Sequence, residues 1–290
     1  MKTYLFLFYG LEKELPALKS AFEILKHFGG HLKVLHIMPQ LDYTPISHGY
    51  DYYALSNDVI ERMEAENEEQ AGKAQALFLE VAKEYDLPVV SEDNFSHNVS
   101  ASWFVCTKGR FAPNLLKESR LCDLVILHKD ISENVASYYE HAASIILFDA
   151  RCPILLVTDE DVLKPTNMHS LVAWDSGLEA EKAIMHAMPF LQVSEKIDIL
   201  LENIAENKIE PDGNDVKTYL LHHGVQSKIM NVKDKKLETG EAILKHAKNL
   251  KANLLVMGAY GHSRIREALL GGVTKHVLKY AHCPVLLSHY

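Results

Sequence analysis

The stretch Leu254-Leu255-Val256-Met257-Gly258-Ala259-Tyr260-Gly261 joins a short apolar run to two glycines three positions apart. Nine residues later, Gly271-Gly272-Val273-Thr274 opens an amphipathic segment, which ends at Cys283-Pro284-Val285-Leu286-Leu287. Glycines leave backbone N–H groups uncovered where a side chain would crowd them, and the N-terminus of a helix adds partial positive charge. The order of strand, glycine pair, glycine, helix and strand therefore predicts a backbone cradle for phosphate.

This order resembles that of the universal stress protein family, whose nucleotide-binding members carry G-x2-G-x9-G-[ST] between the fourth strand and the fourth helix. Gly258, Gly261 and Gly271 match the motif, and Gly272 stands where the family has Ser or Thr. The missing hydroxyl removes one bond to phosphate, worth on the order of 1 kcal/mol or somewhat more near a charged group, and lowers affinity up to about tenfold. The N–H group of Gly272 remains, so binding is expected to survive.

The resemblance also implies the other residues of an adenine-nucleotide site, with ATP, ADP or AMP as the ligand, with or without Mg²⁺. Asp175 would contact adenine or ribose, and Leu201 or Glu202 would offer backbone groups to the purine. Each residue has a structural alternative as well, since Asp175 can cap a helix, glycines make turns and the Thr274 hydroxyl can cap backbone. The remaining implied contacts are Met257, Gly258, Gly261, His262, Gly271, Gly272, Val273 and Thr274.

The chain repeats itself at an offset of about 130 residues, which indicates duplication of one unit. The sequence CDLVIL at 122–127 parallels ANLLVM at 252–257, and RCPILLV at 151–157 parallels HCPVLLS at 282–288. Between the copies lies a polar segment with a proline. Together with the resemblance, this predicts a tandem protein with one domain at 1–158 and a second at 168–290.

The first copy lacks the residues of the predicted nucleotide site. Opposite the first glycine pair stand residues 128–131 (HKDI), and opposite Gly271-Gly272 stand Glu140 and His141. The first strand ends at Tyr9-Gly10, without an Asp that matches Asp175. We therefore expect one domain that binds nucleotide and one degenerate domain, which serves as a pairing partner or as a site for another purpose.

Short apolar runs alternate with helical periodicity in both halves, which predicts an α/β fold with parallel sheets covered on both faces. In such open sheets, ligands bind beyond the carboxyl ends of the strands. The tyrosine-rich segment 42–57 is expected to be a surface loop, or else a lid or partner contact. Strands are expected at 4–9, 32–37, 88–91, 124–127, 154–157, 170–174, 197–201, 227–230, 254–257 and 284–288, and helices at 14–28, 57–85, 110–119, 178–191, 212–223, 239–249 and 272–281.

Composition restricts the class of protein. The net charge of −9 disfavours nonspecific binding to nucleic acid, and no apolar run is long enough for a membrane span. The short apolar run near the N-terminus reads as a strand, not as a signal peptide. Four cysteines without a CxxC pattern indicate a reducing cytoplasm. Sixteen histidines show no metal-ligand spacing, so no metal site is expected.

The sequence also lacks a P-loop, a dinucleotide fingerprint and a nucleophile elbow. Without these motifs we expect no enzymatic activity, with slow ATP hydrolysis left open, and the resemblance implies ligand binding in a stress-response or signalling role. The alternative is an interaction module without a nucleotide. The final strand is expected to pair with the other half of the chain, and a homodimer through it is the alternative.

Overall fold

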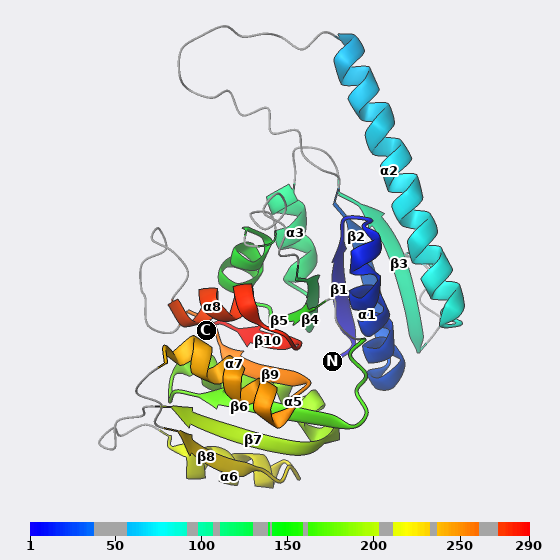
Figure 1. The fold of residues 1–290 in the computed structure, drawn as a ribbon. Helices are drawn as coiled ribbons and strands as arrows, with labels where there is room; N and C mark the ends of the chain where they lie inside the picture. The colour runs from blue at the N-terminus through cyan, green and yellow to red at the C-terminus, as the bar shows by residue number, and fades with distance from the viewer. Residues whose placement is uncertain are drawn as a thin grey trace, which may run out of the picture.

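In the computed structural model, both halves of the chain form one ten-stranded sheet with the order β3-β2-β1-β4-β5-β10-β9-β6-β7-β8 (Figure 1). Each half contributes five strands in the same relative order. All neighbours are parallel except β5 and β10 at the junction. The structure describes residues 1–37, 57–91, 98–106, 111–129, 139, 141–158, 162–202, 211–232, 237–260 and 272–290, without the side chains of 57–60, 63, 64 and 202.

The strands are rich in Val, Ile, Leu and Phe because helices cover both faces of the sheet. Five strands lie within 1–158, and the other five lie within 168–290. They are β1 (Thr3–Phe8), β2 (Gly30–His36), β3 (Val99–Val105), β4 (Leu124–His128), β5 (Ile154–Val157), β6 (Met168–Trp174), β7 (Ser194–Glu202), β8 (Lys228–Val232), β9 (Leu254–Gly258) and β10 (Val285–Ser288).

Two hydrophobic cores lie on opposite faces of the sheet, since successive strand residues alternate between them. Helices of both halves contribute to each core. The short η1 (Glu12–Glu14) precedes the first helix. One face is covered by α1 (Leu15–Phe28), α2 (Asn57–Glu84), α5 (Leu178–Val193) and α6 (Gly213–His222), and the other by α3 (Phe111–Ser119), η2 (Ile145–Ala150), α7 (Thr239–Leu250) and α8 (Gly272–Tyr280).

The predicted α/β class is confirmed, and most predicted elements agree with the observed ones within a few residues. The strand predicted at 88–91 is wrong: Val89 forms only an isolated bridge to Ala101, and the edge strand is β3. Strand β3 was not predicted because Ser100 and Ser102 interrupt its apolar pattern. Both serines are buried, and their hydroxyls hydrogen-bond the two ring nitrogens of His31. The helical residues 141–150 were also not predicted, and the tyrosine-rich segment lies outside the described residues.

The halves meet at β5 and β10, where Leu155 lies opposite Leu286. These two leucines occupy equivalent positions in the repeated Cys-Pro-x-Leu sequence, so the junction has approximate two-fold symmetry. The final strand is paired on both sides, with β5 and with β9. This is the internal pairing that the sequence favoured, and it leaves β10 in the interior of the sheet.

Further contacts join the halves on one face of the sheet. The ring of Phe28 in α1 lies 5.3 Å from the ring of Phe190 in α5. In the connecting segment, Leu163 is buried, and its N–H donates to the Ser20 hydroxyl of α1 at 2.8 Å. The two halves therefore share a core, and the connection is packed against it.

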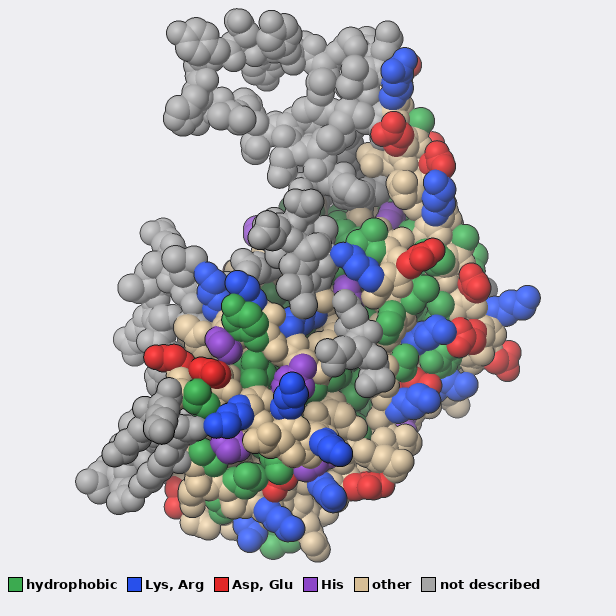
Figure 2. All heavy atoms as spheres, viewed as in Figure 1, with side chains coloured by type: hydrophobic (Ala, Val, Ile, Leu, Met, Phe, Trp, Pro, Cys, Tyr) green, Lys and Arg blue, Asp and Glu red, His purple; other side chains and the backbone are tan. Residues whose placement is uncertain are grey.

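The surface carries charges of both signs. Figure 2 shows acidic side chains along the projecting α2, and Lys and His side chains over α7 and α8. Every helix within the described residues is too short or too polar to cross a membrane.

The junction predicts a large cost for truncating its central leucine. Leu286 is fully buried, so Leu286→Ala should lower the free energy of unfolding by about 2–5 kcal/mol through lost burial and a cavity. Urea denaturation measures this change. The control is Leu121→Ala, because Leu121 is 87% exposed and its loss should cost no more than about 0.5 kcal/mol. Equal effects of the two substitutions would contradict the junction as described.

Candidate functional site

Strand register brings predicted site residues together at one edge of the second half. Trp174 of β6 aligns with Leu201 of β7, and Ala173 aligns with Met257 of β9. Asp175 directly follows Trp174, and Gly258 directly follows Met257. All these residues therefore lie where the carboxyl ends of parallel strands meet, which is where open α/β sheets bind ligands.

Asp175 combines an exposed side chain with a structural role. Its Oδ1 accepts the N–H of Gly177 at 2.9 Å, immediately before α5. The next residue, Ser176, has a φ of 65° and donates its hydroxyl to the carbonyl of Pro211 at 3.1 Å. The helix-start alternative for Asp175 is thus observed, and its exposure leaves the carboxylate accessible to a ligand.

Gly258 is needed for packing. A Cβ atom at this position would lie 2.6 Å from the backbone nitrogen of Ala180 and 2.8 Å from the carbonyl carbon of Glu179. The first turn of α5 therefore lies directly against the end of β9. The absence of a side chain brings the N-terminus of a helix to the same edge as Asp175 and Leu201.

The start of α8 is open, in contrast to Gly258. A Cβ atom on Gly272 would have no neighbour within 4 Å, and Gly272 is exposed. Val273 is half-buried against the core, and Thr274 is buried. The Thr274 hydroxyl accepts the N–H of Tyr260 at 3.2 Å. Of the two roles considered for Thr274, the structure therefore shows the one in which its hydroxyl caps backbone. Gly261, His262 and Gly271 lie outside the described residues, as does Glu140 of the first half.

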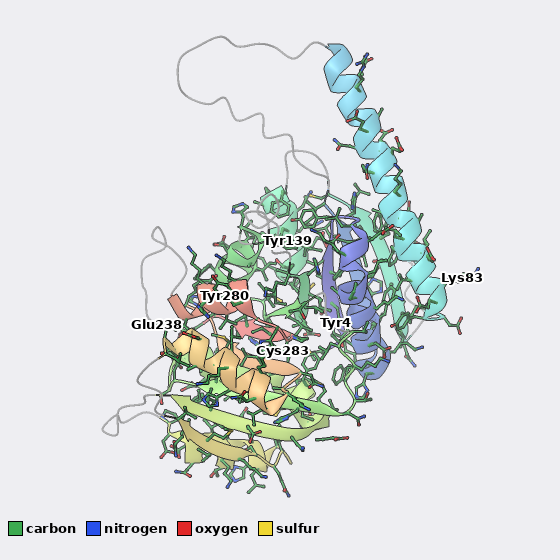
Figure 3. All side chains as sticks on the ribbon, in the orientation of Figure 1. Tyr4, Lys83, Tyr139, Glu238, Tyr280 and Cys283 are labelled. Atoms are coloured by element: carbon green, nitrogen blue, oxygen red, sulfur yellow. The ribbon has the colours of Figure 1, made fainter. Side chains whose placement is uncertain are left out.

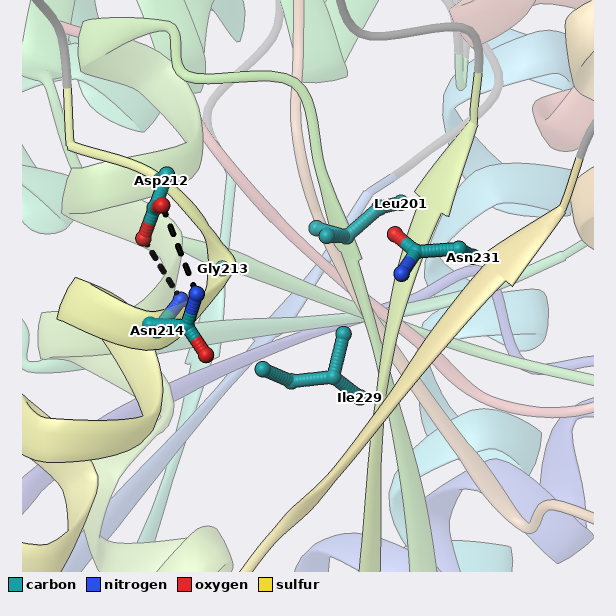
Figure 4. Close-up of a pocket in the computed structure, with 6 residues that line it drawn as sticks. All are labelled: Leu201, Asp212, Gly213, Asn214, Ile229 and Asn231. Carbon is teal, nitrogen blue, oxygen red and sulfur yellow. Dashed lines mark hydrogen bonds between the residues drawn. The ribbon is translucent and has the colours of Figure 1, made fainter. Parts of the chain in front are cut away.

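A pocket of about 380 Å³ lies beside Leu201, between the ends of β7 and β8 and the start of α6 (Figure 4). Gly213 allows the helix to approach closely, because a Cβ atom there would lie 2.6 Å from Cδ1 of Leu201. Backbone N–H groups of Asp215 and Asn214 donate to the carboxylate of Asp212, and these hydrogen bonds lower the pKa of this carboxyl. Sequence reasoning identified Leu201 but missed the rest of the lining, namely Asp212, Gly213, Asn214, Ile229 and Asn231.

The corresponding edge of the first half is filled by its own side chains. Phe6 aligns with Ile126 as Val172 aligns with Val256, which places Tyr9 at the position of Asp175 and His128 at that of Gly258. His128 is fully buried. Its ring centre lies 6.3 Å from that of Tyr139, which in turn lies 5.0 Å from Tyr9.

A buried carboxyl group accepts hydrogen bonds from backbone amides at the sheet edge of the first half. Glu14 is fully buried and accepts the N–H groups of Tyr9 and Leu11 at 3.0 and 2.9 Å. Tyr139, labelled in Figure 3, donates its hydroxyl to Glu14 at 2.8 Å. Burial raises the pKa of Glu14 to about 7, although its hydrogen bonds act in the opposite direction. The Glu14 carboxyl thus satisfies backbone donors at this edge of the first half.

Metal binding has no support from the described side chains. Among them, no three His, Cys, Asp or Glu residues are grouped so that they could hold a metal ion. The described residues at the open edge of the second half offer backbone amides, helix N-termini and the exposed carboxylates of Asp175 and Asp212.

The molecule is thus a two-part α/β protein in which one sheet edge is open and its counterpart is closed. Residues 148–289 match the model of the universal stress protein family. Universal stress protein MJ0577 of Methanocaldococcus jannaschii is 26% identical to the chain over 164 residues, which are 56% of this chain and 92% of that protein. The second half of the chain therefore matches the universal stress protein family.

Solved structures show that the likeness in fold extends over both halves. A universal stress protein from Archaeoglobus fulgidus aligns over 99% of this chain and 96% of its own, with a TM-score of 0.67 and 16% sequence identity. Protein PA1789 of Pseudomonas aeruginosa aligns over 99% of this chain and 92% of its own, with a TM-score of 0.58 and 16% identity. At this level of identity the similarity concerns the fold.

The packing of Gly258 predicts that an added methyl group is costly there. Gly258→Ala should destabilise the protein by about 1–3 kcal/mol, because the backbone of α5 cannot easily move away. Denaturant unfolding measures the change. Gly72→Ala is the matched control, since a Cβ in the middle of α2 meets nothing and should stabilise the helix by about 0.5–1 kcal/mol. A neutral Gly258→Ala would contradict the close approach.

The buried Glu14 predicts a specific pH dependence. Its pKa is raised in the folded protein from the ordinary 4.5 to about 7, so the folded state holds this proton more tightly than the unfolded state. The free energy of unfolding should therefore fall as pH rises from about 4.5 to about 7, by on the order of 1–3 kcal/mol. Urea unfolding across this range measures the slope.

Glu14→Gln should remove this contribution, because the amide does not titrate. The control is Glu12→Gln, which changes an exposed residue two positions earlier and should keep the wild-type slope. The same pH slope in wild type and Glu14→Gln would show that the buried carboxyl does not titrate in this range.

Proposed function

We propose that the second half of this chain binds an adenine nucleotide, ATP, ADP or AMP, in a non-catalytic stress-response or signalling role. The observation that carries the proposal is the arrangement at one sheet edge. The exposed Asp175, Leu201 with its pocket, and Gly258 lie at the ends of neighbouring strands there. The equivalent edge of the first half is closed, so the predicted difference between the halves has a counterpart in side-chain geometry.

The parts of this edge suit different parts of a nucleotide. The exposed N-terminus of α8 at Gly272 offers backbone N–H groups and positive partial charge to phosphates. Asp175 can accept ribose hydroxyl groups, and the pocket beside Leu201 offers apolar and amide surface to a base. The predicted contacts of Gly261, His262 and Gly271 belong to the phosphate end of the same proposal.

The residues at this edge favour binding of the nucleotide without its hydrolysis. Asp175 already accepts a backbone N–H, and Thr274 is engaged with Tyr260. A ligand that prefers one conformation of the protein shifts its population, which is sufficient for a signal. Steady phosphate release from ATP that disappears in Gly258 or Gly261 variants would instead indicate slow hydrolysis.

A second candidate is an interaction module that holds no nucleotide. It is favoured by the structural roles of Gly258 and Thr274, which account for both residues without a ligand. Millimolar ATP should raise the melting temperature under the first candidate and leave it unchanged under the second, since a ligand bound by the native state stabilises the protein. Nucleotide released from freshly purified protein would favour the first candidate.

Substitutions at Gly272 test the proposed phosphate position. Gly272→Ser should strengthen ATP binding by about five- to tenfold by adding the family's hydroxyl. Gly272→Asp should weaken it by about tenfold or more, because its carboxylate repels phosphate. Isothermal titration calorimetry of the full chain, with and without Mg²⁺, measures both changes.

The matched control is Gly272→Asn, which has nearly the same size without the charge. All three side chains have room, and an acidic residue at a helix start favours folding, so lost binding would not reflect lost structure. Equal affinity of the Asp and Asn variants would place the phosphates elsewhere. A wild-type protein that gives no heat with ATP, ADP or AMP would leave the interaction module as the function.

A further inference from the structure

The turn that follows β9 is held by several contacts. We call Ala259 and Tyr260, which lie inside the glycine motif, the 259–260 turn. The N–H of Ala259 donates to the carbonyl of Ser288 at 2.8 Å, and the N–H of Tyr260 donates to Thr274 at 3.2 Å. Tyr260 has a φ of 67°, a backbone conformation that a bulky residue rarely adopts without support.

One contact to this turn comes from the first half of the chain. The ring of Phe148 in η2 lies 4.8 Å from the ring of Tyr260 and 4.5 Å from that of His289. His289 also hydrogen-bonds the carbonyl of Ala259 through Nδ1 at 2.9 Å. Tyr260 is only 8% exposed, so the aromatic group packs closely around the turn. The first half thereby contacts the strand end that opens the proposed phosphate site.

The first half also contacts the far end of α8. Lys129 follows β4 and is 6% exposed, and its Nζ donates to the carbonyl of Ala281 at 2.5 Å. Ala281 directly follows α8, between Tyr280 and Cys283, which are labelled in Figure 3. Carbonyls at the end of a helix carry partial negative charge, so a cation is favourable there. The opposite end of the same helix starts at Gly272.

We propose that the first half acts as a positioning element for the glycine motif of the second. Phe148 supports the 259–260 turn, and Lys129 fixes the end of α8. The two contacts hold the turn near the start of the motif and the helix that begins at its end. This gives a role to a half whose own sheet edge is closed. Its consequence for nucleotide affinity rests on the proposed function, whereas its consequence for the turn itself does not.

Amide hydrogen exchange tests the positioning without any ligand. Phe148→Leu should increase exchange in the peptide 254–260 by about three- to tenfold relative to β1 of the same variant, because the turn opens locally. Phe78→Leu is the matched control: Phe78 is fully buried in the same half, where it packs on Phe22 and Trp103. This control should leave the relative exchange of the turn unchanged.

A second pair of variants tests the helix end. Lys129→Met should increase relative exchange in the peptide 272–281 by a similar factor. Lys33→Met is its control, because Lys33 is a partly buried ammonium of the first half that is paired with Glu118 instead. Unchanged relative exchange in both Phe148→Leu and Lys129→Met would overturn the inference.

ATP affinity of the full-length variants links the turn to the ligand. Phe148→Leu should weaken ATP binding by about five- to thirtyfold, whereas Phe78→Leu should not change it. If ATP binds wild type, Phe148→Leu and Phe78→Leu equally while exchange is also unchanged, the inference fails and the proposed function stands. If wild type binds no ATP but exchange in the turn responds as expected, the proposed function fails and the positioning role stands.

Discussion

The antiparallel pairing of β5 with β10 determines how the rest of the molecule is arranged. It joins two sheets of identical strand order into one, with Leu155 opposite Leu286. Because these strands run in opposite directions, the carboxyl end of β10 lies beside the beginning of β5. The edge of the second half is therefore adjacent to η2, the segment that leads into β5, and Phe148 can reach Tyr260 across the junction.

The two halves have the same strand order, but the sheet edge of one is filled by side chains and that of the other is open. In the first half, Glu14, Tyr139 and His128 fill the edge where the strands end, and backbone amides bind the Glu14 carboxyl. In the second half, Asp175 is exposed and a pocket lies beside Leu201. Strand order alone therefore does not determine which edge is available to a ligand. The few residues that follow each strand decide this.

Much of the architecture could be predicted from the sequence, because continuous apolar strands and amphipathic helices have distinct periods. The repeated Cys-Pro-x-Leu sequence also indicated the duplication. The edge strand β3 escaped prediction, since its buried Ser100 and Ser102 resemble surface residues until His31 is seen to bond them. Long-range partners of this kind leave no local signal.

Contacts between distant parts of the chain also limited what could be predicted of the candidate site. Asp175, Leu201 and Gly258 were identified from motif and strand position, and the register places them side by side. The sequence could not show that Gly258 is packed against α5, that Thr274 bonds Tyr260, or that Asn214 and Asn231 line a pocket. Each of these depends on elements that are distant along the chain.

The covalent connection between the halves has a consequence for how the molecule can change over evolutionary time. Lys129 and Ala259 occupy matching places, since their N–H groups bond the carbonyls of Val157 and Ser288 at 2.7 and 2.8 Å. In an assembly of two identical chains, any substitution at that place would be made in both copies at once. Within one polypeptide, a lysine can be fixed on one side while an alanine is kept on the other. In a single polypeptide each half can therefore be substituted independently of the other, so different roles for the two halves are accessible to single mutations.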